Sequence, residues 1–283
     1  MPNQPFCVTV ISMKVPPVVL SIAGFDPSSG AGITADVKTA AAHGCFAVSC
    51  PTALTVQSSQ GVVDVRPVVP DFVLRAVDAL AEDLEIAAVR VGMLGSASVA
   101  ETVARLLKKW ELHNIVLDPV LRSSSGAALL DAPGLQVLRR ELLPLADVIT
   151  PNLEEAGILA DDPAISIDSP WEVVLPWLRA TAAKLHGLGS RAVVITGGHL
   201  PEANDYLSYV ADGTVREQVF PGTRIESGST HGTGCAFAMS LACHLALGQE
   251  LPPAVRAAKA FVRRAVDSAY PVGKGIGPLN HMV

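Results

Sequence analysis

Short apolar extended runs alternate with helical segments along almost the whole chain, and the connections between them are short. Extended runs are expected at residues 18–23, 46–56, 87–93, 115–117, 148–149 and 192–196. Helices are expected to begin near residues 33 and 71, to follow Asn152, and to cover 98–110, 135–142, 171–188, 236–247 and 253–269. This alternation predicts an α/β fold with one mostly parallel sheet and helices on both faces.

Residues 206–220 depart from the alternation, because two extended runs flank the pair Asp212-Gly213. An Asp-Gly pair between such runs is a strong hairpin signal, so antiparallel strands are expected near the C-terminal part. In the helix that begins near residue 71, the residues expected to face the core are Phe72, Val73, Val77 and Leu80.

Composition narrows the classes of function that remain open. The 283 residues are 49% hydrophobic and 17% charged with a net charge of −6, and no cluster of Lys and Arg is interleaved with aromatics, which argues against nucleic acid as a partner. Five cysteines without a C-x-x-C pair fit neither a disulfide framework nor a zinc knuckle, so a cytoplasmic location is expected. No apolar run is long enough to span a bilayer, so no membrane partner is expected. Residues 1–14 are interpreted as a loose leader, and residues 15–283 as one domain.

The stretch Ser229-Thr230-His231-Gly232-Thr233-Gly234-Cys235 precedes an apolar helix that Gly248 is expected to end. A glycine turn at a helix N-terminus presents free N–H groups and the positive end of the helix dipole, which suits a phosphate or an oxyanion. Cys235 falls in the first turn, where the same field would stabilise a thiolate. The alternative is a turn that only lets a core helix pack.

Polar residues follow several of the expected strands, where an open α/β sheet binds its ligands. They are Asp26, Gln57, Asp118, Asn152 with Glu155, and His199. Each one alone is better explained as a turn former or a helix cap, but several at one edge of the sheet, next to a glycine-rich anion turn, favour a ligand site. No Walker loop and no G-x-G-x-x-G motif is present, and the glycines of residues 273–277 are interpreted as a structural turn.

Eight motifs in order resemble the hydroxymethylpyrimidine (phosphate) kinases, the thiamine-pathway branch of the ribokinase superfamily. They are Ala23-Gly24-Phe25-Asp26-Pro27-Ser28-Ser29-Gly30-Ala31-Gly32-Ile33, Thr52-Ala53-Leu54-Thr55-Val56-Gln57, Val91-Gly92-Met93-Leu94, Asp118-Pro119-Val120, Thr150-Pro151-Asn152-Leu153-x-Glu155, Gly197-Gly198-His199, Thr230-His231-Gly232-Thr233-Gly234-Cys235 and Gly275-Ile276-Gly277-Pro278-Leu279-Asn280-His281. The resemblance runs from about residue 17 to 281 and implies a ribokinase-like fold, usually a homodimer.

The resemblance also implies transfer of the γ-phosphoryl group of ATP, with Mg²⁺, to a hydroxymethyl aminopyrimidine and then to its monophosphate. The catalytic residues would be Cys235, beside the acceptor oxygen, and the anion turn of Gly232, Thr233 and Gly234. The substrate-binding residues would be Gly24, Asp26, Ala31, Asp36, Gln57, Met93 and Val120. The nucleotide and phosphate residues would be Asn152, Thr196, Gly198, Thr230 and His231, and the metal residues Asp118 and Glu155.

The chain departs from the family pattern at three positions. Phe25 stands where Ser or Thr is usual, and Ser124 and Thr196 stand where lysines are usual, although Arg122 could supply one charge. The alternatives are a vitamin B6 (pyridoxal, pyridoxine or pyridoxamine) kinase and a pyrimidine-binding protein without turnover. Gln57 favours the pyrimidine, because its amide offers both a donor and an acceptor to an aminopyrimidine edge.

Overall fold

A computed structural model describes residues 15–123, 126–163 and 165–283 of the chain. The expected leader of residues 1–14 and the substituted position Ser124 lie outside the described residues. Within those ranges no helix has the length and apolar character needed to cross a membrane.

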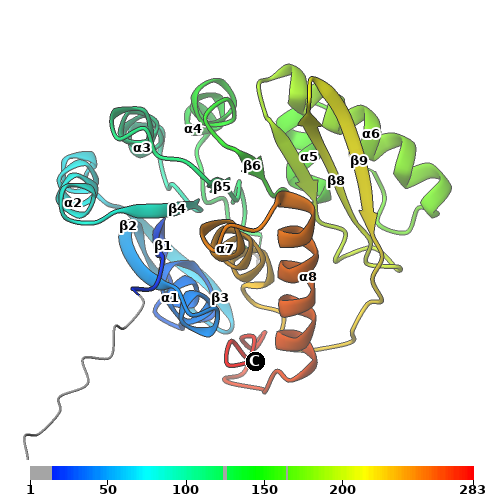
Figure 1. Cartoon of the computed structure of the whole chain (residues 1–283). Helices are drawn as coiled ribbons and strands as arrows, with labels where there is room; N and C mark the ends of the chain where they lie inside the picture. The colour runs from blue at the N-terminus through cyan, green and yellow to red at the C-terminus, as the bar shows by residue number, and fades with distance from the viewer. Residues whose placement is uncertain (1–14, 124–125, 164) are drawn as a thin grey trace, which may run out of the picture.

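The strands of the described residues form one nine-stranded sheet (Figure 1). They are β1 (Val18–Phe25), β2 (Phe46–Ser58), β3 (Gly61–Pro67), β4 (Ile86–Val91), β5 (Ile115–Leu117), β6 (Val148–Ile149), β7 (Ala192–Ile195), β8 (Asp205–Ala211) and β9 (Thr214–Phe220). Their order is β3-β2-β1-β4-β5-β6-β7-β8-β9. Strands β1, β2, β4, β5, β6 and β7 run parallel, whereas β3, β8 and β9 pair antiparallel with their neighbours.

The mostly parallel sheet and the hairpin near the C-terminal part are thereby confirmed. Strands β8 and β9 turn at Asp212 and Gly213, whose φ angles of 52° and 72° are those of the left-handed region that such a turn requires. The strand β3 was missed by the sequence analysis. It gives the sheet a second antiparallel edge, beside β2.

Helices cover both faces of the sheet, as predicted. They are α1 (Gly32–Ala42), α2 (Pro70–Asp83), α3 (Ala97–Lys109), α4 (Ala132–Val137) with the π-helical turn η1 (Leu138–Leu142), α5 (Leu153–Ala160), α6 (Trp171–Gly187), α7 (Thr233–Ala246) and α8 (Leu251–Asp267). Figure 1 shows α1, α7 and α8 on one side of the sheet and α2, α3 and α4 on the other.

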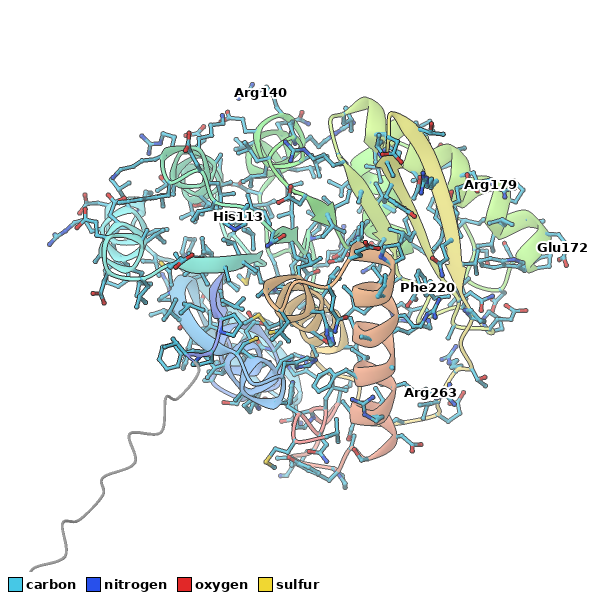
Figure 2. The ribbon with its side chains drawn as sticks, in the orientation of Figure 1. His113, Arg140, Glu172, Arg179, Phe220 and Arg263 are labelled. Atoms are coloured by element: carbon cyan, nitrogen blue, oxygen red, sulfur yellow. The ribbon has the colours of Figure 1, made fainter. Side chains whose placement is uncertain are left out.

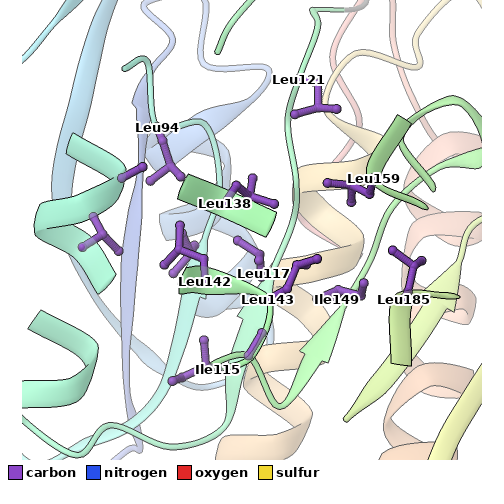
Figure 3. Packing of buried hydrophobic residues seen from close by; sticks show 14 of the residues in the cluster. Leu94, Ile115, Leu117, Leu121, Leu138, Leu142, Leu143, Ile149, Leu159 and Leu185 are labelled. Atoms are coloured by element: carbon purple, nitrogen blue, oxygen red, sulfur yellow. The ribbon is translucent and has the colours of Figure 1, made fainter. Parts of the chain in front are cut away.

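Successive side chains of a strand point to opposite faces of the sheet. Alternate residues of the central strands therefore belong to two separate hydrophobic cores. Leu20, Val89 and Leu117 belong to the core under α2 to α6, whereas Val19, Ala88 and Val116 pack against α7 and α8. Figure 3 shows Leu117 packed among the leucines of the first core. Both faces are therefore apolar, which is why these strands are continuous apolar runs in the sequence. Charged side chains such as Arg140, Glu172, Arg179 and Arg263 point outward from the helices (Figure 2).

One predicted core position is wrong. Val73 and Val77 of α2 are fully buried, but Phe72 is 49% exposed. Pro70 and Asp71 open the helix, so Phe72 falls in its first turn, beside the apolar stripe. An apolar residue in the first turn does not by itself report the inner face of a helix.

The strand order places the site. The chain passes from β1 to β2 on one side and later returns to β4 on the other, so β1 and β4 are neighbours at the point where the order reverses. In open α/β sheets, ligands bind in the crevice beyond the carboxyl ends of the strands at such a point.

Candidate active site

The carboxyl ends of β1 and β4 meet side by side at Gly24 and Met93. A Cβ atom at Gly24 would lie 2.7 Å from Met93 Sδ, so only a glycine leaves room for this side chain. Met93 packs with Ala53 and Leu129 in a small apolar cluster, against which Val120 also lies. Three of the predicted substrate-binding residues, Gly24, Met93 and Val120, therefore surround one apolar wall.

The two glycine segments that follow β1 and precede α7 are pressed against each other. Gly232 has a φ of 87°, and a Cβ atom there would lie 1.9 Å from the carbonyl oxygen of Gly30. A Cβ atom at Gly30 would in turn lie 2.2 Å from His231 Cδ2. These backbones come closer than any side chain allows, which explains the glycines at both positions.

Helix α7 begins at Thr233, with Gly232 as its N-cap. The first hydrogen bond within the helix is donated by Ala236 N–H to Gly232 O at 2.9 Å, so the N–H groups of Gly234 and Cys235 precede the bonded turns. Gly234 is exposed, and a Cβ atom on it would lie 4.0 Å from Asp118 Oδ1. The turn is thus open to an anion directly above Asp118.

Asp26, predicted to bind substrate, is occupied by its own loop. Its carboxylate accepts hydrogen bonds from the N–H groups of Ser28 (2.8 Å), Gly30 (3.2 Å) and Ala31 (2.9 Å). His231 Nε2 lies 2.8 Å from Asp26 Oδ2. Burial opposes ionisation, but the hydrogen bonds of His231 and Ser28 outweigh it and lower the pKa of Asp26. This carboxylate fixes the shape of the loop and joins it to the anion turn.

Gln57 lies at the end of β2 and faces the same loop. Its Nε2 lies 3.1 Å from His231 Nε2, and its Oε1 accepts from Thr55 Oγ1 at 3.1 Å. A cavity of about 130 Å³ opens beside it, lined by the β2–β3 turn, His231, Gly275 and Ile276.

The C-terminal tail is hydrogen-bonded to the β2–β3 turn, because the N–H groups of Lys274 and Gly275 donate to Ser59 Oγ. The glycines of residues 273–277 thus form the predicted structural turn.

A buried charge cluster lies below the anion turn. Asp36 is fully buried on α1, accepts from Ser21 Oγ at 2.5 Å, and pairs through Oδ2 with Arg90 Nη1 at 3.1 Å. Arg90 Nη2 bonds Asp118 Oδ2. Sequence analysis missed Arg90, which stands inside the apolar strand β4.

Burial sets the protonation of these groups. It raises the pKa of Asp36 to about 6, even though the charge of Arg90 acts in the opposite direction. It likewise raises the pKa of Asp118. The pKa of Arg90 is also raised: burial alone would lower it, but the charge of Asp36 outweighs burial. The cluster therefore contains a permanently charged guanidinium beside two carboxyl groups whose pKa values are raised.

The expectation of a thiolate at Cys235 is wrong. Burial raises the pKa of its thiol to about 11, and the negative charges of Asp118 and Asp36 add to this effect, whereas Arg90 counteracts it. The helix dipole favours a thiolate, but it acts here against desolvation and two carboxylates. At neutral pH the side chain is a neutral thiol.

The strand ends of β6 and β7 hold the predicted nucleotide residues. Asn152 caps α5 in a reciprocal capping box with Glu155, whose Oε2 accepts from Asn152 N–H at 3.0 Å. Thr196 forms a bridge with Asn152 and donates its N–H to Pro151 O at 2.9 Å. The cap explanation therefore holds for the Asn152 side chain, while the Asn152 backbone lies beside Thr196.

The loop after β7 is fixed by a hydrogen bond at Gly197 and exposed at Gly198. Gly197 N–H donates to Asp205 Oδ1 at 2.9 Å, and Asp205 Oδ2 pairs with Lys259 Nζ at 2.8 Å. Gly198 is exposed, with no atom within 4 Å of the position of a Cβ. Arg122, the expected substitute for a lysine, lies 3.5 Å from Glu154 in an exposed ion pair.

The carboxylates of Asp118 and Glu155 are suitable ligands for a divalent cation that also binds phosphates. Burial raises the pKa of Glu155 to about 8, and the charge of Asp118 adds to this effect. No cluster of three or more His, Cys, Asp or Glu suited to a metal occurs in the part of the chain that the structure describes. Mg²⁺ is commonly held by one or two carboxylates together with substrate phosphates and water, which is the set available here.

The fold and the site together define a ribokinase-like phosphotransferase for a small molecule. The family model described as phosphomethylpyrimidine kinase matches residues 26–280, and the chain belongs to this family. It is 41% identical to the hydroxymethylpyrimidine/phosphomethylpyrimidine kinase of Streptomyces coelicolor, with 94% of each chain covered.

Two solved structures share the fold. The phosphomethylpyrimidine kinase of Clostridium difficile 630 is 32% identical, with a TM-score of 0.73, and the match covers 88% of this chain and 99% of that one. The pyridoxal kinase of Bacillus subtilis in complex with ADP is also 32% identical, with a TM-score of 0.82 over 94% of this chain and 97% of that one.

Proposed function

We propose that the protein phosphorylates 4-amino-5-hydroxymethyl-2-methylpyrimidine, and then its monophosphate, in thiamine biosynthesis, with ATP and Mg²⁺. The observation that carries this proposal is the convergence of Gln57, Met93 and the anion turn at the β1–β4 crevice, in a chain of the phosphomethylpyrimidine kinase family. We place the reaction in the cytoplasm and assign it to residues 15–283 as one domain.

The pyrimidine would bind against the apolar wall of Met93 and Val120, with the Gln57 amide at its polar edge. Its hydroxymethyl oxygen would then point to Cys235. We assign Gly24 and Ala31 to the same pocket, and Asp36 to its floor, where one oxygen of the buried carboxylate, Oδ1, has no hydrogen-bond partner among the described residues. An unpaired buried oxygen is costly unless a ligand donates to it, and the 4-amino group is such a donor.

The γ-phosphoryl group would lie on the N–H groups of Gly232, Thr233 and Gly234. Phosphoryl transfer depends mainly on positioning and on offsetting the charge of the transferring group. The hydroxymethyl oxygen would bond to the γ-phosphorus as the bond from that phosphorus to the β-phosphate oxygen breaks, the hydroxyl proton would pass to solvent water, and ADP would leave. Asp118 and Glu155 would hold the Mg²⁺, which supplies positive charge to the phosphates. Asn152, Thr196, Gly198, Thr230 and His231 would lie along the nucleotide.

The neutral thiol of Cys235 suits two successive acceptors. A carboxylate in its place would repel the anionic monophosphate that serves as acceptor in the second transfer, whereas a thiol with a pKa of about 11 does not. This explains how one site could accept both the alcohol and its phosphate.

The test incubates the protein with Mg-ATP and the aminopyrimidine, with pyridoxal in a parallel tube, and follows products by phosphorus NMR. Pyrimidine monophosphate followed by pyrophosphate is expected. Monophosphate alone would limit the proposal to the first transfer, and the absence of product in both tubes would leave a binding protein.

Vitamin B6 phosphorylation is the second candidate, since a pyridoxal kinase shares the fold with a TM-score of 0.82. Pyridoxal phosphate as the main product would favour it. Gln57 would decide between the two, because its amide offers both a donor and an acceptor, which suits the edge of an aminopyrimidine. Gln57→Met is therefore expected to weaken pyrimidine turnover more than pyridoxal turnover.

We also propose that the protein is a homodimer. The β2–β3 edge exposes apolar side chains that include Leu54 (50% exposed), Val56 (56%) and Val63 (81%). Exposed apolar residues gathered on a sheet edge are typical of an interface between chains. Sedimentation equilibrium tests this: a monomer at micromolar concentration contradicts the proposal.

A further inference from the structure

Among the described residues, Arg90 is the largest of the fully buried side chains, and it is the fifth of the six residues of strand β4, near the carboxyl end of that strand. A guanidinium that is removed from water must be paired, because isolated buried charges are very costly. Its two partners come from different elements, Asp36 from α1 and Asp118 from the segment after β5. One side chain thus joins the floor of the acceptor pocket to the predicted metal side.

The backbone beside Arg90 is shaped to hold the guanidinium. A Cβ atom at Gly92 would lie 2.1 Å from Arg90 Nη1 and 2.5 Å from its Cζ. Gly92 immediately precedes Met93, whose Sδ lies against Gly24. The guanidinium therefore touches the backbone that leads into the apolar wall of the acceptor pocket, as well as both carboxylates.

The positive charge of Arg90 lies close to the carboxylates of the site and to the proposed position of the acceptor. Asp118 lies close to the anion turn, with its Oδ1 4.0 Å from the position of a Cβ on Gly234, and Asp36 shares Arg90 with it. Burial raises the pKa of Cys235, and the charge of Arg90 acts against that effect. ATP adds negative charge in both transfers, but the acceptor itself is neutral in the first transfer and anionic in the second. A fixed cation in a low-dielectric interior acts strongly on such a difference.

We propose that Arg90 is a positioning residue of the reaction: it holds Asp36 and Asp118 at a fixed separation beneath Cys235, and its buried positive charge favours the anionic acceptor of the second transfer over the neutral acceptor of the first. This inference rests on the proposed function. It assigns a role to a residue that touches neither substrate, and it separates two effects, position and charge.

Three variants distinguish these effects. Arg90→Gln removes the charge, Arg90→Lys keeps the charge but cannot bond both carboxylates in the same way, and Gly92→Ala keeps the arginine but displaces its guanidinium. Arg191→Met is the matched control, because Arg191 forms an exposed ion pair with Asp147. The readouts are kcat and KM with the aminopyrimidine and with its monophosphate, each as the added acceptor, and thermal unfolding.

All three variants are expected to lower kcat with both acceptors, and Arg191→Met is not. For Arg90→Gln, the ratio of second-transfer to first-transfer kcat is expected to fall about tenfold, while Arg90→Lys and Gly92→Ala keep a ratio near that of the wild type. An unchanged ratio in Arg90→Gln would overturn the inference, as would wild-type kcat in either of the milder variants. Should Arg90→Gln fail to fold, those two variants still decide the positioning role.

The outcome for the wild type separates the two proposals. A wild-type protein that phosphorylates neither acceptor defeats the proposed function itself. A wild-type protein that phosphorylates both, with a ratio that does not respond to Arg90→Gln, defeats only the role of Arg90.

Discussion

Gly232→Ala tests whether the anion turn depends on the close contact of its backbone with the loop after β1. The φ of 87° alone costs an alanine about 1–2 kcal/mol. Its Cβ would also lie 1.9 Å from the carbonyl oxygen of Gly30, which is backbone and cannot rotate away. Backbone strain combined with such an overlap typically costs about 3–5 kcal/mol in the free energy of unfolding.

Gly248→Ala is the matched control. Gly248 has a nearly equal φ of 81°, at the other end of the same helix, but no atom lies within 4 Å of the position of its Cβ. It should therefore cost about 1–2 kcal/mol from backbone strain alone. The difference between the two variants, about 1–4 kcal/mol, isolates the close contact with Gly30.

Urea unfolding measures the stability difference, and steady-state kinetics at a temperature where both variants are folded measures its consequence for the reaction. A displacement of the turn by about 1 Å is expected to lower kcat about 100-fold in Gly232→Ala. Gly248→Ala should keep the wild-type kcat. Equal stability losses in the two variants, or an unchanged kcat in Gly232→Ala, would refute the reasoning.

Three further predictions concern protonation and the acceptor side chain. Iodoacetamide should alkylate Cys235 slowly at neutral pH and faster toward its pKa of about 11, with Cys235→Ser as the blank; a plateau near pH 7 would contradict the burial argument. Glu155 has a folded pKa of about 8 against an ordinary 4.5, so its contribution to stability is complete below the unfolded pKa and is lost as the pH rises through about 8. Urea unfolding across this window should show a decline that Glu155→Gln makes shallower, and an equal slope in both proteins would exclude Glu155 as its source. Cys235→Asp should slow the second transfer more than the first, measured with each acceptor supplied separately, and a wild-type ratio of the two rates would show that the neutral thiol is unimportant.

The sheet and its helices were predictable because their signals are local. The runs before Gly24 and Asp118 are apolar on both faces, and the Asp212-Gly213 pair specifies its own turn. The glycine turn before α7 was likewise recognisable, because a glycine segment and a helix start lie next to each other in the sequence.

The charge cluster was not predictable, since its members lie far apart in the chain. Arg90 is separated from Asp36 by 54 positions in the sequence and from Asp118 by 28. Within β4 it is a single polar residue between two valines, and nothing local indicates its partners. The burial and the carboxylate charges that act on Cys235 have the same origin. The helix start that favours a thiolate is visible in the sequence, whereas the burial and the two carboxylates that oppose it are tertiary.

The contact between Asp26 and His231 also has a consequence for synthesis of the chain. These residues are 205 positions apart, so the loop after β1 leaves the ribosome long before the segment that completes it. At about 5–20 residues per second, the interval is on the order of 10–40 s. Contacts of such separation form late and slowly. A nascent chain that stops before His231 would carry the loop after β1 and the apolar wall of Met93 without the glycine turn that precedes α7, so the two halves of the crevice would meet only after the last quarter of the chain has begun to emerge.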